Sequence, residues 1–143
     1  MITVLLVDDH ELIRTGVKGI LDKAPDIEVA AEASNGEEAV EMVRQIPVDV
    51  VLMDVNMPGM GGIEATRRVL RVNPKLKVIA LTVLDDDPFP TRLHEVGAMG
   101  FLTKGCPADG VAGRTLTRVI SRGGAGGGAG PCTVIVFWTA LLP

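Results

Sequence analysis

The sequence predicts an α/β protein built on a parallel sheet with helices on both faces. Residues 1–120 alternate between short apolar runs and segments of helical periodicity, which is the pattern of successive strand–helix units. The apolar runs are continuous, as in parallel strands that are buried on both faces. A chain of 143 residues is long enough for one domain with a hydrophobic core. The expected strands are residues 2–7, 27–33, 48–53, 77–82 and 99–103.

Helices are expected between these apolar runs. After the first strand, apolar residues repeat at helical spacing, at Leu12, Ile13, Val17, Ile20 and Leu21. The second helix is expected at residues 36–45 and the third at residues 62–72, again with their apolar residues on one side. Each of these faces can pack against the sheet.

The last two helices rest on weaker signals. The fourth, near residues 88–96, begins with Pro88, and proline is compatible with the first turn of a helix. The fifth starts at Pro107 and contains Gly110 and Gly113, each of which costs about 0.8–1 kcal/mol relative to alanine inside a helix. We therefore expect a fifth helix whose first half is frayed.

Polar side chains follow four of the expected strands. Asp8 and Asp9 follow the first strand, Asp54 the third, Thr82 ends the fourth, and Lys104 follows the fifth. The carboxyl ends of parallel strands line one crevice, so these side chains are expected to lie together. Three acids, a hydroxyl and an ammonium group suit a divalent cation and a phosphoryl group, because Mg²⁺ bridges carboxylate and phosphoryl oxygens.

The oxygen ligands for Mg²⁺ can be assigned by residue. Mg²⁺ usually takes one or two carboxylates and keeps several waters, which suits Asp9 and Asp54 as direct ligands and Asp8 acting through water. The backbone carbonyl of Asn56 offers a further oxygen, and Lys104 offers a compact positive charge to phosphoryl oxygens. Bland alternatives exist: Asp9 as a helix N-cap, Asp54 as an Asx-turn, and Thr82 and Lys104 as ordinary surface or strand residues. His10 is expected to be a surface residue at a helix start and His94 to lie on a solvated helix face, and neither is assigned to catalysis.

The composition excludes some functions. The net charge is −4 and no dense basic run is present, so a polycationic nucleic-acid binder is not expected. No signal-peptide pattern precedes the first strand, and no apolar stretch reaches the roughly 20 residues that span a bilayer. Cys106 and Cys132 match no metal or redox spacing and are expected to be reduced thiols. These observations predict a cytoplasmic protein without a membrane partner.

The polar strand ends and their neighbours resemble the receiver domain of bacterial two-component response regulators. The similarity covers about residues 1–120, and residues 86–93 resemble the GacA/UvrY-like subgroup of LuxR/NarL-type regulators. The segments that carry the family resemblance are Val4-Leu5-Leu6-Val7-Asp8-Asp9-His10, Asp49 to Gly59, Ala80-Leu81-Thr82 and Gly97 to Lys104.

This resemblance implies a flavodoxin-like (CheY-like), doubly wound sheet of five parallel strands in the order 2-1-3-4-5. It implies that Asp54 accepts a phosphoryl group from the phosphohistidine of a sensor histidine kinase in the presence of Mg²⁺. It further implies that Thr82 is the switch hydroxyl, Phe101 the switch aromatic and Lys104 the phosphate-contacting lysine. Such a domain is a switch and not a turnover enzyme, and its parent protein is expected to regulate transcription and to form a homodimer on phosphorylation.

The carboxyl-terminal part departs from the family pattern. Gly105 stands where many receivers have a proline, and residues 121–131 read as a Gly-rich linker. Residues 132–143 form an atypical, uncharged, β-prone tail. We expect no DNA-binding domain in this chain, so that DNA contact would require an output domain outside it. A truncated, engineered or out-of-frame tail is favoured, and a docking strand is the functional alternative.

Two other functions remain as alternatives. An aspartate-nucleophile, Mg²⁺-dependent phosphohydrolase of the haloacid-dehalogenase type needs a second acid two residues after the nucleophile, but Asn56 occupies that position and cannot donate a proton as a general acid. A constitutive interaction module would keep the acidic cluster only as structure. Leu84, two residues after Thr82, could shield a phosphoryl group from water, which predicts a long-lived aspartyl phosphate.

Overall fold

A computed structural model gives the fold of residues 2–55, 57–82, 95–98, 100–103 and 134–136. Within those ranges no helix is both long and apolar enough to cross a membrane. The elements in chain order are β1 (Ile2–Val7), α1 (Glu11–Asp22), β2 (Ile27–Ala33), α2 (Gly36–Gln45), β3 (Val50–Asp54), α3 (Gly61–Val72), β4 (Lys77–Thr82), β5 (Gly100–Thr103) and β6 (Val134–Val136).

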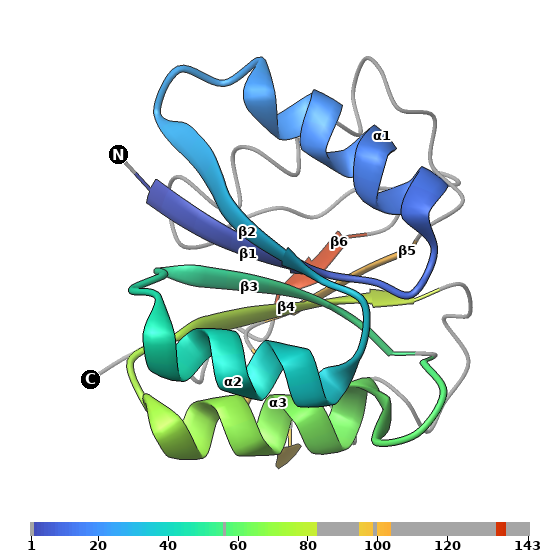
Figure 1. Cartoon of the computed structure of the whole chain (residues 1–143), viewed down its shortest axis with the longest axis vertical. Coiled ribbons are helices and arrows are strands. Elements are labelled where there is room, and N and C mark those ends of the chain that lie inside the picture. Colours follow the sequence, from blue (N-terminus) through green and yellow to red (C-terminus); the bar gives the residue numbers. More distant parts are fainter. Residues whose placement is uncertain (1, 56, 83–94, 99, 104–133, 137–143) are drawn as a thin grey trace.

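The strands form one sheet in the order β2-β1-β3-β4-β5-β6 (Figure 1). The pairs from β2 to β5 are parallel, which confirms the flavodoxin-like order 2-1-3-4-5. The expectation of five strands is corrected by β6, which lies in the apolar tail and pairs antiparallel with β5. Without β6, β5 would be an edge strand whose outward backbone N–H and C=O groups have no partners in the sheet. The β-branched run Val134–Val136 pairs with these groups of β5.

Helices cover both faces of the sheet, with α1 on one face and α2 and α3 on the other (Figure 1). Successive residues of β1 serve opposite faces, because side chains alternate along a strand. Val4 and Leu6 pack in the core that includes Leu21 of α1. Leu5 and Val7 pack in the core that includes residues of α2 and α3. The side chains from Val4 to Val7 are all fully buried, which explains why this part of the strand is a continuous apolar run.

The start of α2 is fixed by a side-chain cap. The Asn35 side-chain oxygen accepts a hydrogen bond from the backbone N–H of Glu38 at 2.8 Å. In return, the Glu38 carboxylate accepts from the Ser34 hydroxyl at 2.7 Å and from the Asn35 amide at 3.2 Å. This reciprocal arrangement is a variant of the capping box, and α2 begins at Gly36 as the sequence predicts.

Some boundaries differ from those predicted. β3 begins at Val50 and not at residue 48, because Asp49 turns its carboxylate back to the Thr3 backbone N–H and hydroxyl, each at 3.0 Å. α3 begins one residue early, at Gly61. The fourth helix, apart from residues 95 and 96, the fifth helix and the Gly-rich linker lie outside the described residues.

Candidate functional site

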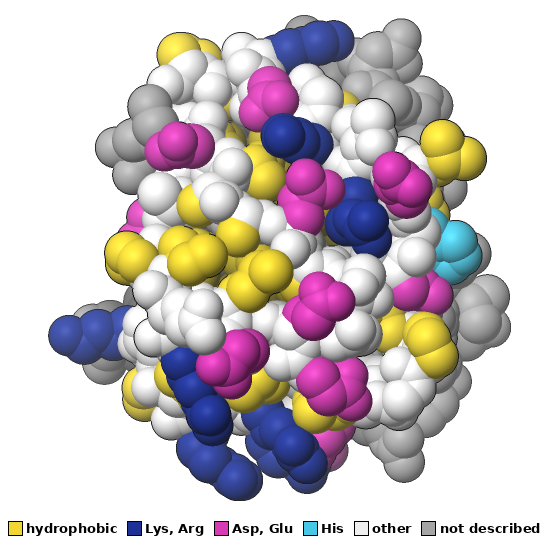
Figure 2. All heavy atoms as spheres, viewed as in Figure 1, with side chains coloured by type: hydrophobic (Ala, Val, Ile, Leu, Met, Phe, Trp, Pro, Cys, Tyr) yellow, Lys and Arg dark blue, Asp and Glu magenta, His cyan; other side chains and the backbone are white. Residues whose placement is uncertain are grey.

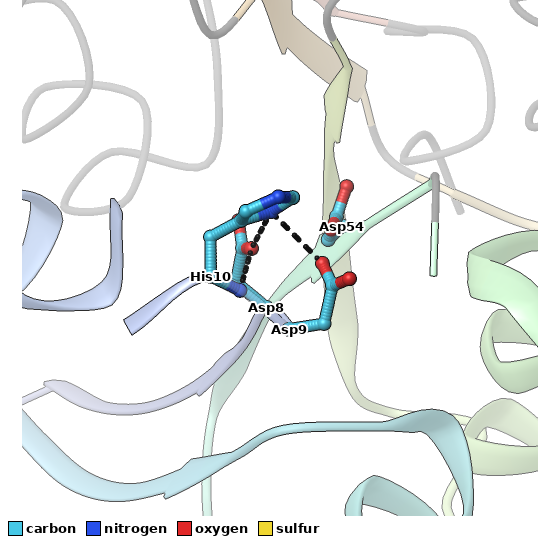
Figure 3. A group of neighbouring side chains, drawn as sticks. All are labelled: Asp8, Asp9, His10 and Asp54. Atoms are coloured by element: carbon cyan, nitrogen blue, oxygen red, sulfur yellow. Dashed lines mark hydrogen bonds and ion pairs between the residues drawn. The ribbon is translucent and has the colours of Figure 1, made fainter. Parts of the chain in front are cut away.

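Three aspartates meet at the carboxyl edge of the sheet. Asp8 and Asp9 follow β1 directly, and Asp54 is the last residue of β3. These strands are parallel neighbours, with Val7 paired to Met53, so both strand ends reach the same edge. One ligand atom from each of Asp8, Asp9, His10 and Asp54 can be chosen so that all four lie within 4.8 Å of one another (Figure 3). The structure thus brings together the three acids that the sequence singled out.

The environment of the acids is unequal. Asp8 and Asp54 are fully buried, whereas the Asp9 side chain is 25% exposed. Burying carboxylates close together is costly unless hydrogen bonds or a cation compensate for the lost hydration. Asp9 therefore lies on the solvent side of the cluster.

Backbone and side-chain bonds fix Asp8. Its N–H donates to the Ala33 carbonyl at the end of β2, at 3.1 Å. Its carboxylate accepts from the His10 N–H at 2.8 Å, which is the two-residue reach of an Asx-turn. Its carbonyl accepts from the Arg14 guanidinium on α1. This Asx-turn at Asp8 aims the chain into α1.

The expectation that Asp9 caps the first helix is wrong. The N-cap of α1 is His10, and α1 starts at Glu11 without a side-chain cap. The Asx-turn at Asp8 precedes this start and holds the His10 N–H. The Asp9 carboxylate therefore belongs to the acidic cluster and does not cap α1.

His10 joins the cluster, which sequence reasoning did not predict. Its Nδ1 lies 3.0 Å from an Asp9 carboxylate oxygen and 3.4 Å from an Asp8 carboxylate oxygen (Figure 3). The side chain is 62% exposed, so the surface position was anticipated, and a histidine is visible at the surface in Figure 2. The available signal was its place directly after Asp8-Asp9, before the first helix.

The chain after Asp54 is packed tightly against α3. Val55 N–H donates to the Leu81 carbonyl of β4 at 2.9 Å, and Gly62 N–H donates to the Val55 carbonyl at 3.1 Å. A Cβ on Gly62 would lie only 2.1 Å from the Asp54 carbonyl oxygen. The second residue of α3 therefore has to be glycine for the helix to reach this close to Asp54.

The other predicted site residues are placed only in part. Thr82 ends β4, one residue beyond Leu81, the β4 partner of Asp54, and it pairs with Thr103 of β5. Its backbone therefore lies at the same sheet edge as the acids. Phe101 lies in β5, paired with Ala80. The remaining predicted residues, Asn56, Leu84, His94 and Lys104, lie outside the described residues.

The donor set fits a hard divalent cation. Three carboxylates offer oxygen ligands from two adjacent strand ends, and Mg²⁺ prefers oxygen and takes one or two carboxylates with waters. Two of the acids are fully buried, so a bound cation would act where water screens charge poorly. The arrangement can place a positive charge beside the Asp54 carboxylate.

The comparisons with known proteins agree with this geometry. Residues 4–114 match the response regulator receiver domain family. Over 105 residues, or 73% of this chain, the sequence is 53% identical to response regulator GacA of Pseudomonas viridiflava and 52% identical to response regulator UvrY of Escherichia coli (strain K12). The chain spans about half the length of these relatives, 49% and 48% respectively.

A solved structure shows the same fold. The crystal structure of a LuxR-family two-component response regulator from Aurantimonas sp. SI85-9A1 is similar with a TM-score of 0.75 at 30% sequence identity. The match covers 83% of this chain and 84% of that one. The expected resemblance to receiver domains, and to the GacA/UvrY-like subgroup, is confirmed.

Proposed function

This chain belongs to the response regulator receiver domain family, and we propose that it is a switch in which Asp54 accepts a phosphoryl group from a sensor histidine kinase. The observation that carries the proposal is the buried Asp54 carboxylate, which shares one cluster with Asp8 and Asp9 at the carboxyl edge of the sheet. In the transfer, an Asp54 carboxylate oxygen forms the new P–O bond while the P–N bond of the donor phosphohistidine breaks. The leaving imidazole takes up a proton.

Mg²⁺ is the proposed cofactor. Asp9 and Asp54 would bind it directly, Asp8 would act through water, and the backbone carbonyl of Asn56 would supply another oxygen. When bound, the ion would neutralise charge between the carboxylate and an incoming phosphoryl group. Asp8, through its bonds to the His10 N–H and to Arg14, holds the end of β1 in place for this role.

Thr82, Lys104 and Phe101 are proposed to convert phosphorylation into a change of shape. The Thr82 hydroxyl and the Lys104 ammonium would donate to the phosphoryl oxygens. The sheet topology supports these roles. Thr82 ends β4, the strand beside β3, and pairs with Thr103 of β5. Lys104 directly follows Thr103 in the sequence. Phe101 lies on β5, so movement at Thr82 can reach it across one strand pair. Phosphorylation then shifts the population between two arrangements of this side of the sheet.

The proposed switch does not turn over a substrate. Asn56 stands two residues after Asp54 and cannot act as a general acid, so self-dephosphorylation is expected to be slow. Leu84 adds shielding from water in this proposal. We also propose that the parent protein is a cytoplasmic transcriptional regulator that binds DNA through an output domain and dimerises on phosphorylation.

The test is phosphorylation with acetyl phosphate and Mg²⁺, followed by intact mass. The wild-type chain should gain one hydroxylamine-labile phosphoryl group, and Asp54→Asn should gain none. Asp49→Asn is a matched control, since Asp49 precedes the other end of β3 and bonds Thr3. Wild-type chain that forms no adduct, or an adduct that survives Asp54→Asn, would contradict the proposal. Sustained phosphate-ester turnover lost with Asp54→Asn would instead support the phosphohydrolase.

A further inference from the structure

A pocket that shares no residue with the acidic cluster lies between α2 and α3. Both helices cover the same face of the sheet and pack on one core (Figure 1). The volume of the pocket is about 400 Å³, within the roughly 300–1,000 Å³ of small-molecule sites. The residues that line it are Val40, Arg44, Glu64, Arg68, Arg71 and Val72.

The basic end of this pocket lies away from Asp54. Arg44 and Arg71 stand in the last turns of α2 and α3. From these turns the chain continues to the amino ends of β3 and β4, whereas the acidic cluster is at the carboxyl edge of the sheet. Figure 2 shows Lys and Arg side chains gathered near these helix ends. The pocket is therefore separate from the proposed phosphoacceptor site.

Two of the three arginines in the pocket lack an acidic partner. The Nε atom of Arg68 lies 3.6 Å from a carboxylate oxygen of Glu64, and Glu64 also pairs with Arg67 at 3.1 Å. Glu41 is three residues before Arg44, but its carboxylate accepts from the Gln45 amide at 2.9 Å. Among the residues that the structure describes, neither Arg44 nor Arg71 has an ion pair. Three guanidinium groups and one carboxylate give the pocket a net charge of +2.

The spacing of the arginines on α3 concentrates positive charge. Arg71 follows Arg68 by three residues and Arg67 by four, and side chains at these spacings are neighbours on a helix surface. Like charges placed in this way repel each other, and the whole chain is acidic, with a net charge of −4. An anion bound between the helices would relieve this repulsion.

The chemistry of the lining residues identifies the anion. Guanidinium groups donate paired hydrogen bonds to phosphate oxygens, and a phosphate monoester carries a charge of about −1.5 to −2 at pH 7 on one compact group. One such group balances the net charge of the pocket. Val40 and Val72, the latter 37% exposed, offer apolar contact to the organic part of the ligand. We propose that this pocket binds a small organic phosphate monoester, with Arg44 and Arg71 holding the phosphoryl oxygens.

A simpler explanation assigns Arg44 and Arg71 to the helix ends alone. Basic side chains in the last turn interact favourably with the negative end of the helix dipole. In that case, replacing either arginine lowers only the stability of the fold, and Glu64 has no influence on phosphate. If the pocket is a binding site, Glu64 opposes the ligand, and its neutral variant binds phosphate more tightly.

Titration of the full chain with phenyl phosphate in Mg²⁺-free buffer, followed by ¹H–¹⁵N NMR spectra, tests the proposal. The signals of the last turns of α2 and α3 should shift and saturate. Arg44→Gln and Arg71→Gln should each lower the affinity by about fivefold or more, because a charge-assisted hydrogen bond is lost. Glu64→Gln should raise the affinity by about threefold or more, since a carboxylate no longer faces the anion. Benzoate, with a single negative charge, should bind more weakly than phenyl phosphate.

Arg67→Gln is the matched control. Arg67 is also an exposed arginine of α3 and pairs with Glu64, but it does not line the pocket, so its affinity should stay within about twofold of wild type. Wild-type chain without a saturable shift, an equal loss in Arg67→Gln, benzoate that binds as tightly, or no gain in Glu64→Gln would each overturn the proposal. Loss of binding in Asp54→Asn would place the phosphate at the acidic cluster and would also overturn it. Phosphorylation of Asp54, measured separately by intact mass, is independent of all these outcomes.

Discussion

Replacing Gly62 with alanine is expected to displace the backbone that carries Asp54. A Cβ at this position would lie 2.1 Å from the Asp54 carbonyl oxygen, 2.6 Å from Val55 Cα and 2.8 Å from the Asp54 carbonyl carbon. All three neighbours are backbone atoms, which cannot rotate away as a flexible side chain can. Either α3 or the chain after β3 has to move.

The size of the effect follows from these distances. Widening the shortest contact from 2.1 Å to the 3.0 Å below which Cβ contacts essentially never occur requires a shift of about 0.9 Å. Overpacking of this kind costs about 1–3 kcal/mol, and alanine returns about 1 kcal/mol of helix propensity. We expect a net loss of up to about 2 kcal/mol in the free energy of unfolding. A displacement of about 1 Å at a reacting group also slows a reaction by up to about 10²-fold.

Two measurements and one control test this reasoning. Urea unfolding followed by circular dichroism gives the stability, and intact mass during incubation with acetyl phosphate gives the phosphorylation rate. Gly16→Ala is the matched control, because Gly16 lies inside α1 with nothing within 4 Å of its Cβ position. It should gain about 0.5–1 kcal/mol and keep the wild-type rate. If Gly62→Ala is as stable as Gly16→Ala and reacts at the wild-type rate, the close approach of α3 to Asp54 is refuted.

Two further predictions concern the cap of α2 and the edge of the sheet. Asn35→Ala removes the acceptor for the Glu38 N–H and should cost about 1 kcal/mol in urea unfolding, whereas Gln45→Ala, which removes only an exposed side-chain bond to Glu41, should change stability by less than about 0.5 kcal/mol. Equal losses in the two variants would contradict the capping role. Deleting residues 132–143 removes β6 from β5, so the freed edge should promote self-association in size-exclusion chromatography with light scattering. A truncated chain that stays monomeric at high concentration would count against β6 as an edge cover.

The central strands β1, β3 and β4 could be predicted because most of their residues are buried on both sides. Leu5 and Leu6 of β1 enter different cores, so both must be apolar, and the run stands out in the sequence. The same logic placed the ends of these strands, where the acids begin. Burial is less informative at the start of β3. Val48 is buried, so the sequence pattern includes it in the strand, but the Asp49 side chain bonds Thr3 and β3 begins only at Val50.

The sixth strand could not be predicted with its partner. Residues 134–136 are β-prone by composition, but pairing with β5 depends on an edge that no local pattern specifies. The sequence supported both a docking strand and a truncated, engineered or out-of-frame tail. The register, with Phe101 opposite Ile135, is set by a contact between residues far apart in the chain.

The acidic cluster was predictable to the extent that strand order determines it. Adjacent parallel strands carry Asp8 and Asp54 to one edge whatever the side-chain details. The contribution of His10 depends instead on the backbone at the start of α1, where the Asx-turn at Asp8 holds the His10 N–H. The sequence places His10 at a helix start but does not specify the direction of its side chain, so the nitrogen donor was missed.

The burial of Asp8 and Asp54 links the stability of the fold to its chemistry. Two carboxylates that are fully buried in one cluster repel each other, and their desolvation lowers the stability of the folded chain. Apolar residues at these positions would pack without that cost, so the fold itself does not require the acids. A cation that binds the cluster only in the folded chain offsets the repulsion and stabilises the fold as its concentration rises. The residues that make Asp54 a proposed phosphoacceptor would therefore also make the end of β1 and the end of β3 respond to a bound cation.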